Sequence, residues 1–266
     1  VNVTPDSFSD GGDTFDAAAA IAAGLRLVEA GADVLDIGGE STRPGAAPVA
    51  AAEELERVVP VIEGLRRRTS VPISIDTTKA VVARSALAAG AEIINDISGF
   101  LRDPEMAAVA AETKAGCIAM HMRGTPETMQ QFTDYRDLIG EINEYFRERV
   151  DALLAAGVDR ERICLDPGIG FSKTVEQNLA LINRLDEFVV AQQRPILLAP
   201  SRKSFIGKLL KLDHPKDRVW GTAAAVSCGI MRGARLVRVH DVAAMRQVCD
   251  LALPIALATA ATEDDE

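Results

Sequence analysis

Short runs of apolar and β-branched residues alternate along the chain with longer stretches whose apolar residues recur roughly every 3.6 positions. The short runs lie at residues 32–37, 71–76, 92–96, 116–121, 162–166, 195–199 and 234–240, and a stub at residues 1–3 precedes them. The helical stretches include residues 17–30, 53–68, 81–89, 138–156 and 175–191. Strands that alternate with helices pair in parallel through right-handed crossovers. With the stub counted as a strand, the pattern predicts an α/β protein built as a (β/α)8 TIM barrel.

The alternative α/β architecture is an open doubly wound sheet, but its glycine-rich G-x-G-x-x-G turn does not follow the first strand. No linker or break in composition divides the chain, so we predict one barrel domain over residues 1–260 and a frayed tail at 261–266. Because a barrel strand has roughly five residues, the stub predicts a short or truncated first strand and weaker barrel closure. Five glycines shortly before strands are predicted to cap the preceding helices: Gly31, Gly90, Gly116, Gly157 and Gly233.

Composition narrows the class of protein. The chain is 48% hydrophobic, which is enough to bury a core and excludes general disorder. The net charge of −10 argues against a nucleic-acid or membrane-surface partner, because both favour a basic protein. No apolar run approaches the roughly 18–20 residues of a membrane span. The four cysteines are scattered, which predicts buried, reduced thiols and a cytoplasmic location rather than disulfides or zinc.

Nearly every predicted strand ends in a chemically capable residue. These residues are Asn2, Asp36, Asp76, Asn95, His121, Asp166, Ser201 with Lys203, and Arg238 with His240. A single polar strand end is usually a helix cap or a turn former. A whole series of them at the active-site end of a barrel indicates function. Charges on the inner face of a barrel cost several kcal/mol unless they are paired or contact a ligand.

The donors and acceptors suit one kind of ligand. A carboxylate such as Asp166 or Asp76 can accept the adjacent N–H and NH₂ of a 2-amino-4-oxo-pyrimidine, while Lys203 donates to its carbonyl. Asn95 completes this set. Pterins and guanine both carry that edge, so the residues alone leave both open. The loops after the last two strands commonly bind phosphate in barrels, and there Arg238 and His240 are phosphate candidates, with Arg202 either a ligand or a surface charge.

Two early loops, at residues 4–12 and 40–45, are small and polar and have the composition of mobile lids. Asn2 and Asp10 could offer hard oxygen ligands to Mg²⁺, although their spacing is a weak signal.

Eight motifs in chain order resemble the dihydropteroate synthase family. They are NVTPDSFSDGG at 2–12, DIGGESTRPG at 36–45, IDT at 75–77, NDISG at 95–99, MHM at 120–122, LDPGIGF at 165–171, SRKSFIG at 201–207 and RVHDV at 238–242. The resemblance implies a barrel transferase of folate synthesis. Such an enzyme condenses (7,8-dihydropterin-6-yl)methyl diphosphate with 4-aminobenzoate to give 7,8-dihydropteroate and diphosphate. The chain departs from the family at Ala199–Pro200, where a glycine is usual, and in its short first strand.

The resemblance also implies roles for individual residues. The pterin is expected to contact Asp76, Asn95, Asp166 and Lys203, with Met120 and Asp36 close behind. The diphosphate is expected at Asn2, Arg238 and His240, with Mg²⁺ bound by Asn2 and Asp10. The aminobenzoate pocket is expected at Phe8, Pro44, Phe171, Ser201 and Lys203, with Thr42 and Arg43 contributed by the second loop. The catalytic residues are expected to be Asp76, Lys203, Arg238 and His240. Diphosphate is expected to leave before the amine attacks.

Other functions remain to be separated from this one. A methyltetrahydrofolate:corrinoid methyltransferase would share the pterin carboxylates but handles no diphosphate, so Arg238 with His240 argues against it. An aldolase-type barrel would use Lys203 as a Schiff base, and a non-catalytic relative would bind pterin without turnover. GTP binding is a further possibility, which a competition experiment would test. The resemblance also implies a homodimer, with contacts near residues 219–244, and sensitivity to sulfonamides.

Overall fold

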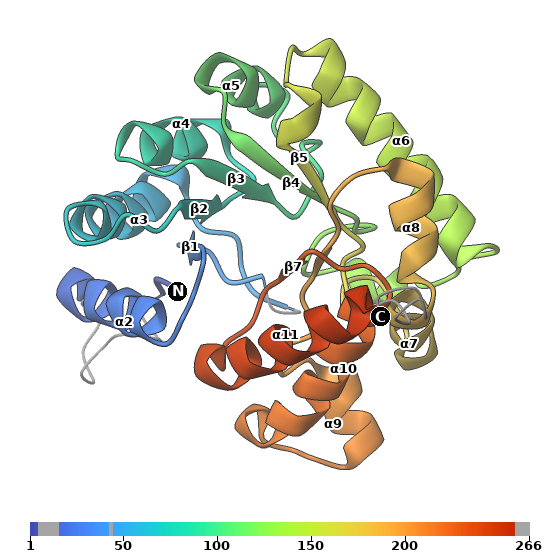
Figure 1. Ribbon diagram of the computed structural model, residues 1–266. Coiled ribbons are helices and arrows are strands. Elements are labelled where there is room, and N and C mark those ends of the chain that lie inside the picture. The colour runs from blue at the N-terminus through green and yellow to red at the C-terminus, as the bar shows by residue number, and fades with distance from the viewer. Residues whose placement is uncertain (5–15, 43–44, 259–266) are drawn as a thin grey trace, which may run out of the picture.

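Parallel strands follow one another in chain order around a barrel, with helices outside them (Figure 1). The computed structural model describes residues 1–4, 16–42 and 45–258. A five-stranded parallel sheet has the order β1 (Leu35–Gly38), β2 (Ile73–Asp76), β3 (Ile93–Asp96), β4 (Gly116–Met120) and β5 (Ile163–Asp166). A parallel pair follows, formed by β6 (Leu197–Leu198) and β7 (Leu236–Val237). Single bridges join Asn2 to Gly38 and Leu165 to Ile196, so the stub and both sheets form one continuous series.

The helices connect successive strands on the outside of this series (Figure 1). They are α2 (Ala17–Glu29), α3 (Ala51–Arg66), α4 (Ala80–Ala88), α5 (Met106–Thr113), α6 (Leu138–Ala155), α7 (Val175–Asn183), α8 (Leu185–Gln192), α9 (Ser204–Leu210), α10 (Val219–Met231) and α11 (Val242–Leu257). Side-chain caps fix several starts: Asp16 accepts from the backbone of α2, and Thr174 forms a capping box with Gln177 at α7. None of the helices in the described residues is long and apolar enough to cross a bilayer.

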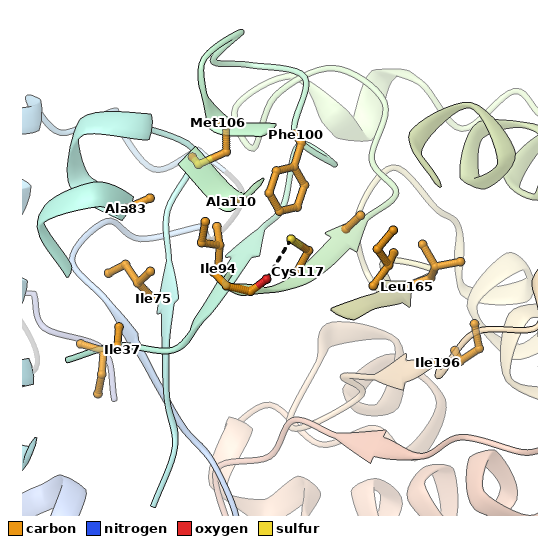
Figure 2. Close-up of a cluster of buried hydrophobic side chains, with 14 of the residues drawn as sticks. Ile37, Ile75, Ala83, Ile94, Phe100, Met106, Ala110, Cys117, Leu165 and Ile196 are labelled. Atoms are coloured by element: carbon orange, nitrogen blue, oxygen red, sulfur yellow. Dashed lines mark hydrogen bonds between the residues drawn. The ribbon is translucent and has the colours of Figure 1, made fainter. Parts of the chain in front are cut away.

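Strand alternation separates two environments, as the residue pattern predicts. Ile37, Ile75 and Leu165 point outward into the main apolar core, which the helices cover (Figure 2). Ile118, Cys164, Leu197 and Ala199 form a small apolar cluster of their own. These residues alternate along their strands with the outward ones, so they fill the barrel interior. The polar residues at the strand ends therefore lie next to this apolar cluster inside the barrel.

The structure corrects four predictions from the sequence. The run at 175–191 is divided at Arg184 into α7 and α8, and the run at 234–240 pairs as a strand only over Leu236–Val237. Gly116 does not cap a helix but begins β4; Lys114 makes the left-handed turn instead, with φ 55°. Of the cysteines, all of which are free thiols, Cys117 and Cys164 are buried, but Cys228 is exposed. The other four predicted cap glycines do have positive φ.

Candidate active site

The predicted pterin residues lie at the carboxyl ends of neighbouring strands. Asp76 on β2 is paired in register with Asn95 on β3, and Met120 on β4 is paired with Asp166 on β5. Residues in register on adjacent parallel strands point to the same face. All four are buried, with exposed fractions of 3–6%. The barrel thus brings together carboxyl and amide groups from β2, β3 and β5 as the alternation predicted.

Arg238, just beyond β7 at one end of the strand series, contacts two carboxylates on β1 and β2 at the other end. Its Nε pairs with Asp36 at the middle of β1, and its Nη2 lies 2.8 Å from Oδ2 of Asp76. The amide of Asn95 donates to Asp36 at 3.3 Å. In the described residues no backbone hydrogen bond joins β7 to the stub, and these side-chain contacts instead join β7 to β1 and β2.

One guanidinium shared by two carboxylates gives them different pKa values. Burial is the largest influence on Asp36 and opposes its ionisation, but the nearby positive charges, that of Arg238 foremost, and the hydrogen bond from Arg238 together outweigh burial and lower the pKa of this group. Burial raises the pKa of Asp76 to about 7, because the attraction of Arg238 is offset by the negative charges of Asp36 and Glu54. Asp36 is therefore the ionised partner at neutral pH, whereas Asp76 exchanges its proton near pH 7.

This difference predicts a pH dependence of stability. The unfolded chain ionises Asp76 near its ordinary pKa of 3.8, while the folded chain retains the proton up to about 7. The folded state therefore binds more protons between these values, so Asp76 makes the free energy of unfolding fall as pH rises through this window. Asp76→Asn removes the effect. In urea denaturation, its stability relative to wild type should be higher at pH 8 than at pH 5; a difference independent of pH would contradict this assignment.

Asp166, Lys203 and Phe171 form the opposite wall of the site. The backbone N–H of Gly168 donates to Oδ1 of Asp166 at 2.7 Å. The ammonium of Lys203 donates to the carbonyl of Ile169 and lies 4.6 Å from the centre of the Phe171 ring, a cation–π geometry. Burial lowers the pKa of Lys203 to about 8, against the attraction of Asp166. The charges of Arg238 and Asp76 also affect the pKa of Lys203. Asp76, Asp166, Lys203 and Arg238 are therefore close enough to interact electrostatically.

Ser201 and His240 lie side by side at the rim. Ser201 Oγ accepts the backbone N–H of His240 at 3.1 Å and lies 3.0 Å from its Nδ1. The hydroxyl of Ser201 can therefore donate a hydrogen bond to Nδ1. The ring proton is then on Nε2, which can donate to an anion. Burial and the nearby charges of Arg202 and Arg238 lower the pKa of His240 to about 4, so the ring is neutral at pH 7. Arg202 itself forms a two-bond ion pair with Asp241.

Comparison with known proteins identifies the family to which this arrangement belongs. Residues 1–240 match the family model described as pterin binding enzyme. Dihydropteroate synthase from Synechocystis is 54% identical over 95% of this chain and 87% of its own length; that from Bacillus subtilis is 49% identical over 91% and 82%. The chain belongs to the dihydropteroate synthase family of pterin-binding enzymes. The dihydropteroate synthase of Xanthomonas albilineans, solved with 4-aminobenzoic acid, superposes with a TM-score of 0.90 at 43% identity, covering 97% of this chain and 92% of that one.

This kinship confirms the predicted family and the barrel fold. Other solved members of the family carry related molecules. The Yersinia pestis enzyme, with a TM-score of 0.90 and 42% identity over 97% of this chain and 92% of its own, was solved with a sulfonamide drug. A further Xanthomonas albilineans structure contains 7,8-dihydropteroate, with a TM-score of 0.87 and 41% identity over the same shares.

The structure describes only some of the other residues to which the family resemblance assigns a role. Thr42 lies partly buried in the loop after β1, and Asn2 is exposed on the stub beside β1. Phe8, Asp10, Arg43 and Pro44, which the family resemblance assigns to aminobenzoate and metal binding, lie outside the described residues. Their roles stay predictions.

The described residues fit a Mg²⁺ ion that is bound chiefly through its substrate. No group of three or more His, Cys, Asp or Glu side chains within 1–4, 16–42 and 45–258 could hold a metal. Asn2 supplies one hard oxygen at the exposed rim, beside Gly38. Mg²⁺ commonly takes only one or two protein ligands and completes its shell with water and phosphate oxygens. The donor set thus suits a metal that arrives with a diphosphate.

Two buried charged groups near the site are not apparent from the sequence. Lys173, after β5, is 4% exposed and contacts His121. Glu54 on α3 is fully buried, and Lys79 donates to both Glu54 and Glu40. In the sequence, each of these residues could equally be a surface charge. Only the position of Lys173 directly after the LDPGIGF motif could have drawn attention to it.

Proposed function

We propose that this chain catalyses the reaction of its family, the condensation of (7,8-dihydropterin-6-yl)methyl diphosphate with 4-aminobenzoate to give 7,8-dihydropteroate and diphosphate. The observation that carries the proposal is the convergence of Asp76, Asp166, Lys203 and Arg238 at one end of the barrel. These groups supply both the acceptors that a pterin edge needs and the positive charge that a diphosphate needs.

Residues on two sides of the site bind the pterin. Asp166 accepts the adjacent N–H and NH₂ groups of the pterin, and Lys203 donates to its carbonyl oxygen. Asn95 and Asp76 contact the ring from the neighbouring strands. Phe171 and Ser201, next to Lys203 and His240 respectively, border the aminobenzoate. Because Lys203 and Phe171 are only partly buried, the groups that would contact substrate remain accessible.

The reaction breaks the bond between the pterin methylene carbon and the diphosphate oxygen, and it forms a bond from that carbon to the aniline nitrogen. Arg238 and the Nε2–H of neutral His240 stabilise the charge that grows on the departing diphosphate. Mg²⁺ bound at Asn2 and Asp10 would add further positive charge there. The carboxylates of Asp76 and Asp166 stabilise the cationic pterin methylene. The aniline nitrogen attacks through its lone pair and then loses a proton to water or diphosphate.

A turnover assay tests this function. Purified protein with both substrates and Mg²⁺ should form 7,8-dihydropteroate and diphosphate in equal amounts, with loss of rate when Mg²⁺ is removed by a chelator. Sulfamethoxazole should compete with 4-aminobenzoate, because it carries the same aniline group. Tight pterin binding with no product would instead identify a non-catalytic pterin binder. Binding of GTP in place of the pterin would favour the nucleotide alternative.

We also propose that the enzyme works as a homodimer in a reducing compartment such as the cytoplasm. Trp220 on α10 and Leu251 and Ile255 on α11 are large, apolar and 53–81% exposed. Leu251 and Ile255, four residues apart, lie on one helix face, which suits a contact with a second copy. The free thiols of all four cysteines support the compartment. A monomeric sedimentation coefficient at micromolar concentration would contradict the dimer.

A further inference from the structure

Lys173 is a buried lysine that none of the assigned roles uses. It lies in the loop between β5 and α7, directly before the Thr174 cap, and is 4% exposed. Within the described residues no carboxylate forms an ion pair with its ammonium. A buried lysine without such a partner is costly, so its retention needs a compensating set of hydrogen bonds.

Three acceptors surround its Nζ atom. The carbonyl oxygen of Phe171 lies at 2.9 Å, Nδ1 of His121 at 3.1 Å and the carbonyl oxygen of His121 at 3.5 Å. Burial lowers the pKa of Lys173 well below its usual range, and these hydrogen bonds offset part of the cost of burying its nitrogen. Burial and the charge of Lys173 lower the pKa of His121 well below its usual range, which keeps the ring neutral.

These contacts join the two loops that carry the pterin carboxylate and the Phe171 ring. On the β4 side, His121 donates its backbone N–H to the carbonyl oxygen of Asp166 at 2.9 Å. On the β5 side, the carbonyl bonded by Lys173 belongs to Phe171, whose ring faces the ammonium of Lys203. The loops are also in close contact at Gly168, where a Cβ atom would lie 2.1 Å from the carbonyl oxygen of His121. A small shift at Lys173 would therefore move Asp166 and Phe171 together, both of which belong to the same wall of the site.

We propose that Lys173 is a positioning residue that holds the Asp166 turn and Phe171 against β4, and so sets the affinity for both substrates without touching either. This inference rests on the proposed function. A positioning role and a purely structural role of Lys173 differ in their effect on the kinetic constants. Loss of folding lowers the amount of active enzyme and hence the apparent kcat, whereas loss of positioning weakens binding and raises KM.

Lys173→Met keeps the length and the apolar stem of the side chain but removes its donors. We expect KM for 4-aminobenzoate and for the pterin diphosphate to rise by about 10-fold or more, with kcat per folded enzyme changed much less. The matched control is Tyr135→Phe. Tyr135 joins the same two loops through Ser172 Oγ at 3.2 Å, but within the described residues its hydroxyl makes no hydrogen bond to Asp166 or to the carbonyl of Phe171. Its loss should leave both KM values within about twofold of wild type.

A second pair of variants decides the matter if Lys173→Met does not fold. Asparagine at position 121 can place an oxygen near the position of the histidine Nδ1, whereas leucine cannot. His121→Asn should therefore keep KM near the wild-type value, while His121→Leu should raise it. A fall in kcat with unchanged KM in Lys173→Met or His121→Leu would overturn the inference. Inactivity of the wild-type protein would instead refute the proposed function, so the two failures are distinguishable.

Discussion

Replacing Arg238 with methionine is expected to destabilise the protein and to remove its preference for a diphosphate-bearing pterin. The substitution leaves Asp36 and Asp76 close together, 17% and 6% exposed, without their shared cation. Removing one partner of a buried ion pair costs about 3–5 kcal/mol. Because Arg238 is itself 36% exposed, solvent screens part of the interaction, and we expect a loss of about 2–3 kcal/mol in the free energy of unfolding at pH 8.

Denaturation in urea measures this loss, and a double variant provides its control. Asp36→Asn combined with Arg238→Met removes the ionised partner as well as the cation. It should recover part of the lost stability, because fewer uncompensated charges remain buried. If the single variant were as stable as wild type, the ion pairs that link the first and last strands would contribute nothing to barrel closure.

Replacing Asp166 with asparagine is expected to lower pterin affinity by about 100-fold, equivalent to about 2.7 kcal/mol. The amide of asparagine turns one of the two acceptors into a donor that faces the donors of the pterin edge. Burial raises the pKa of Asp166 above its ordinary value of 3.8. As pH falls, wild-type affinity should therefore begin to decline at a higher pH than an exposed aspartate would cause, and the variant should lack this decline.

Calorimetric titration of the product pterin checks this effect, with Asp96→Asn as the control. Asp96 is also a buried aspartate at a strand end, but on β3 its carboxylate bonds to Ser98 and to the backbone of Phe100. Its neighbour Asn95, on the opposite face, is the inward residue. Asp96→Asn should lower stability and leave pterin affinity unchanged. Equal affinity losses in the two variants would show that Asp166 has no specific role in recognition.

The sequence predicted local features of this site better than its long-range contacts. Alternation along each strand placed Asp76, Asn95 and Asp166 on the inner face, because side-chain direction in a strand depends only on neighbouring residues. The ion pair between Arg238 and Asp36 joins residues 202 positions apart. It depends on how the barrel closes, which no local pattern encodes. The expectation that Asp36 lies behind the pterin site named no partner for it, and the structure pairs it with Arg238.

Two other features show why local rules failed. Gly116 was predicted to cap a helix because glycine favours positive φ, but Lys114 adopts that conformation and lets β4 begin at the glycine. Lys173 escaped attention because lysine is nearly always exposed. Its burial depends on three acceptors supplied by two loops, after β4 and after β5. In both cases tertiary contacts outweighed the preference of the single residue.

In the proposed reaction, one set of side chains in the barrel binds the pterin and another set binds its diphosphate. Arg238→Lys keeps the positive charge but loses the planar fork of the guanidinium. Calorimetric titration of this variant with pterin diphosphate and with the product pterin shows whether the two sets of side chains act separately. We expect a large loss of affinity for the diphosphate ligand and a small loss for the pterin. Equal losses for the two ligands would contradict this proposal.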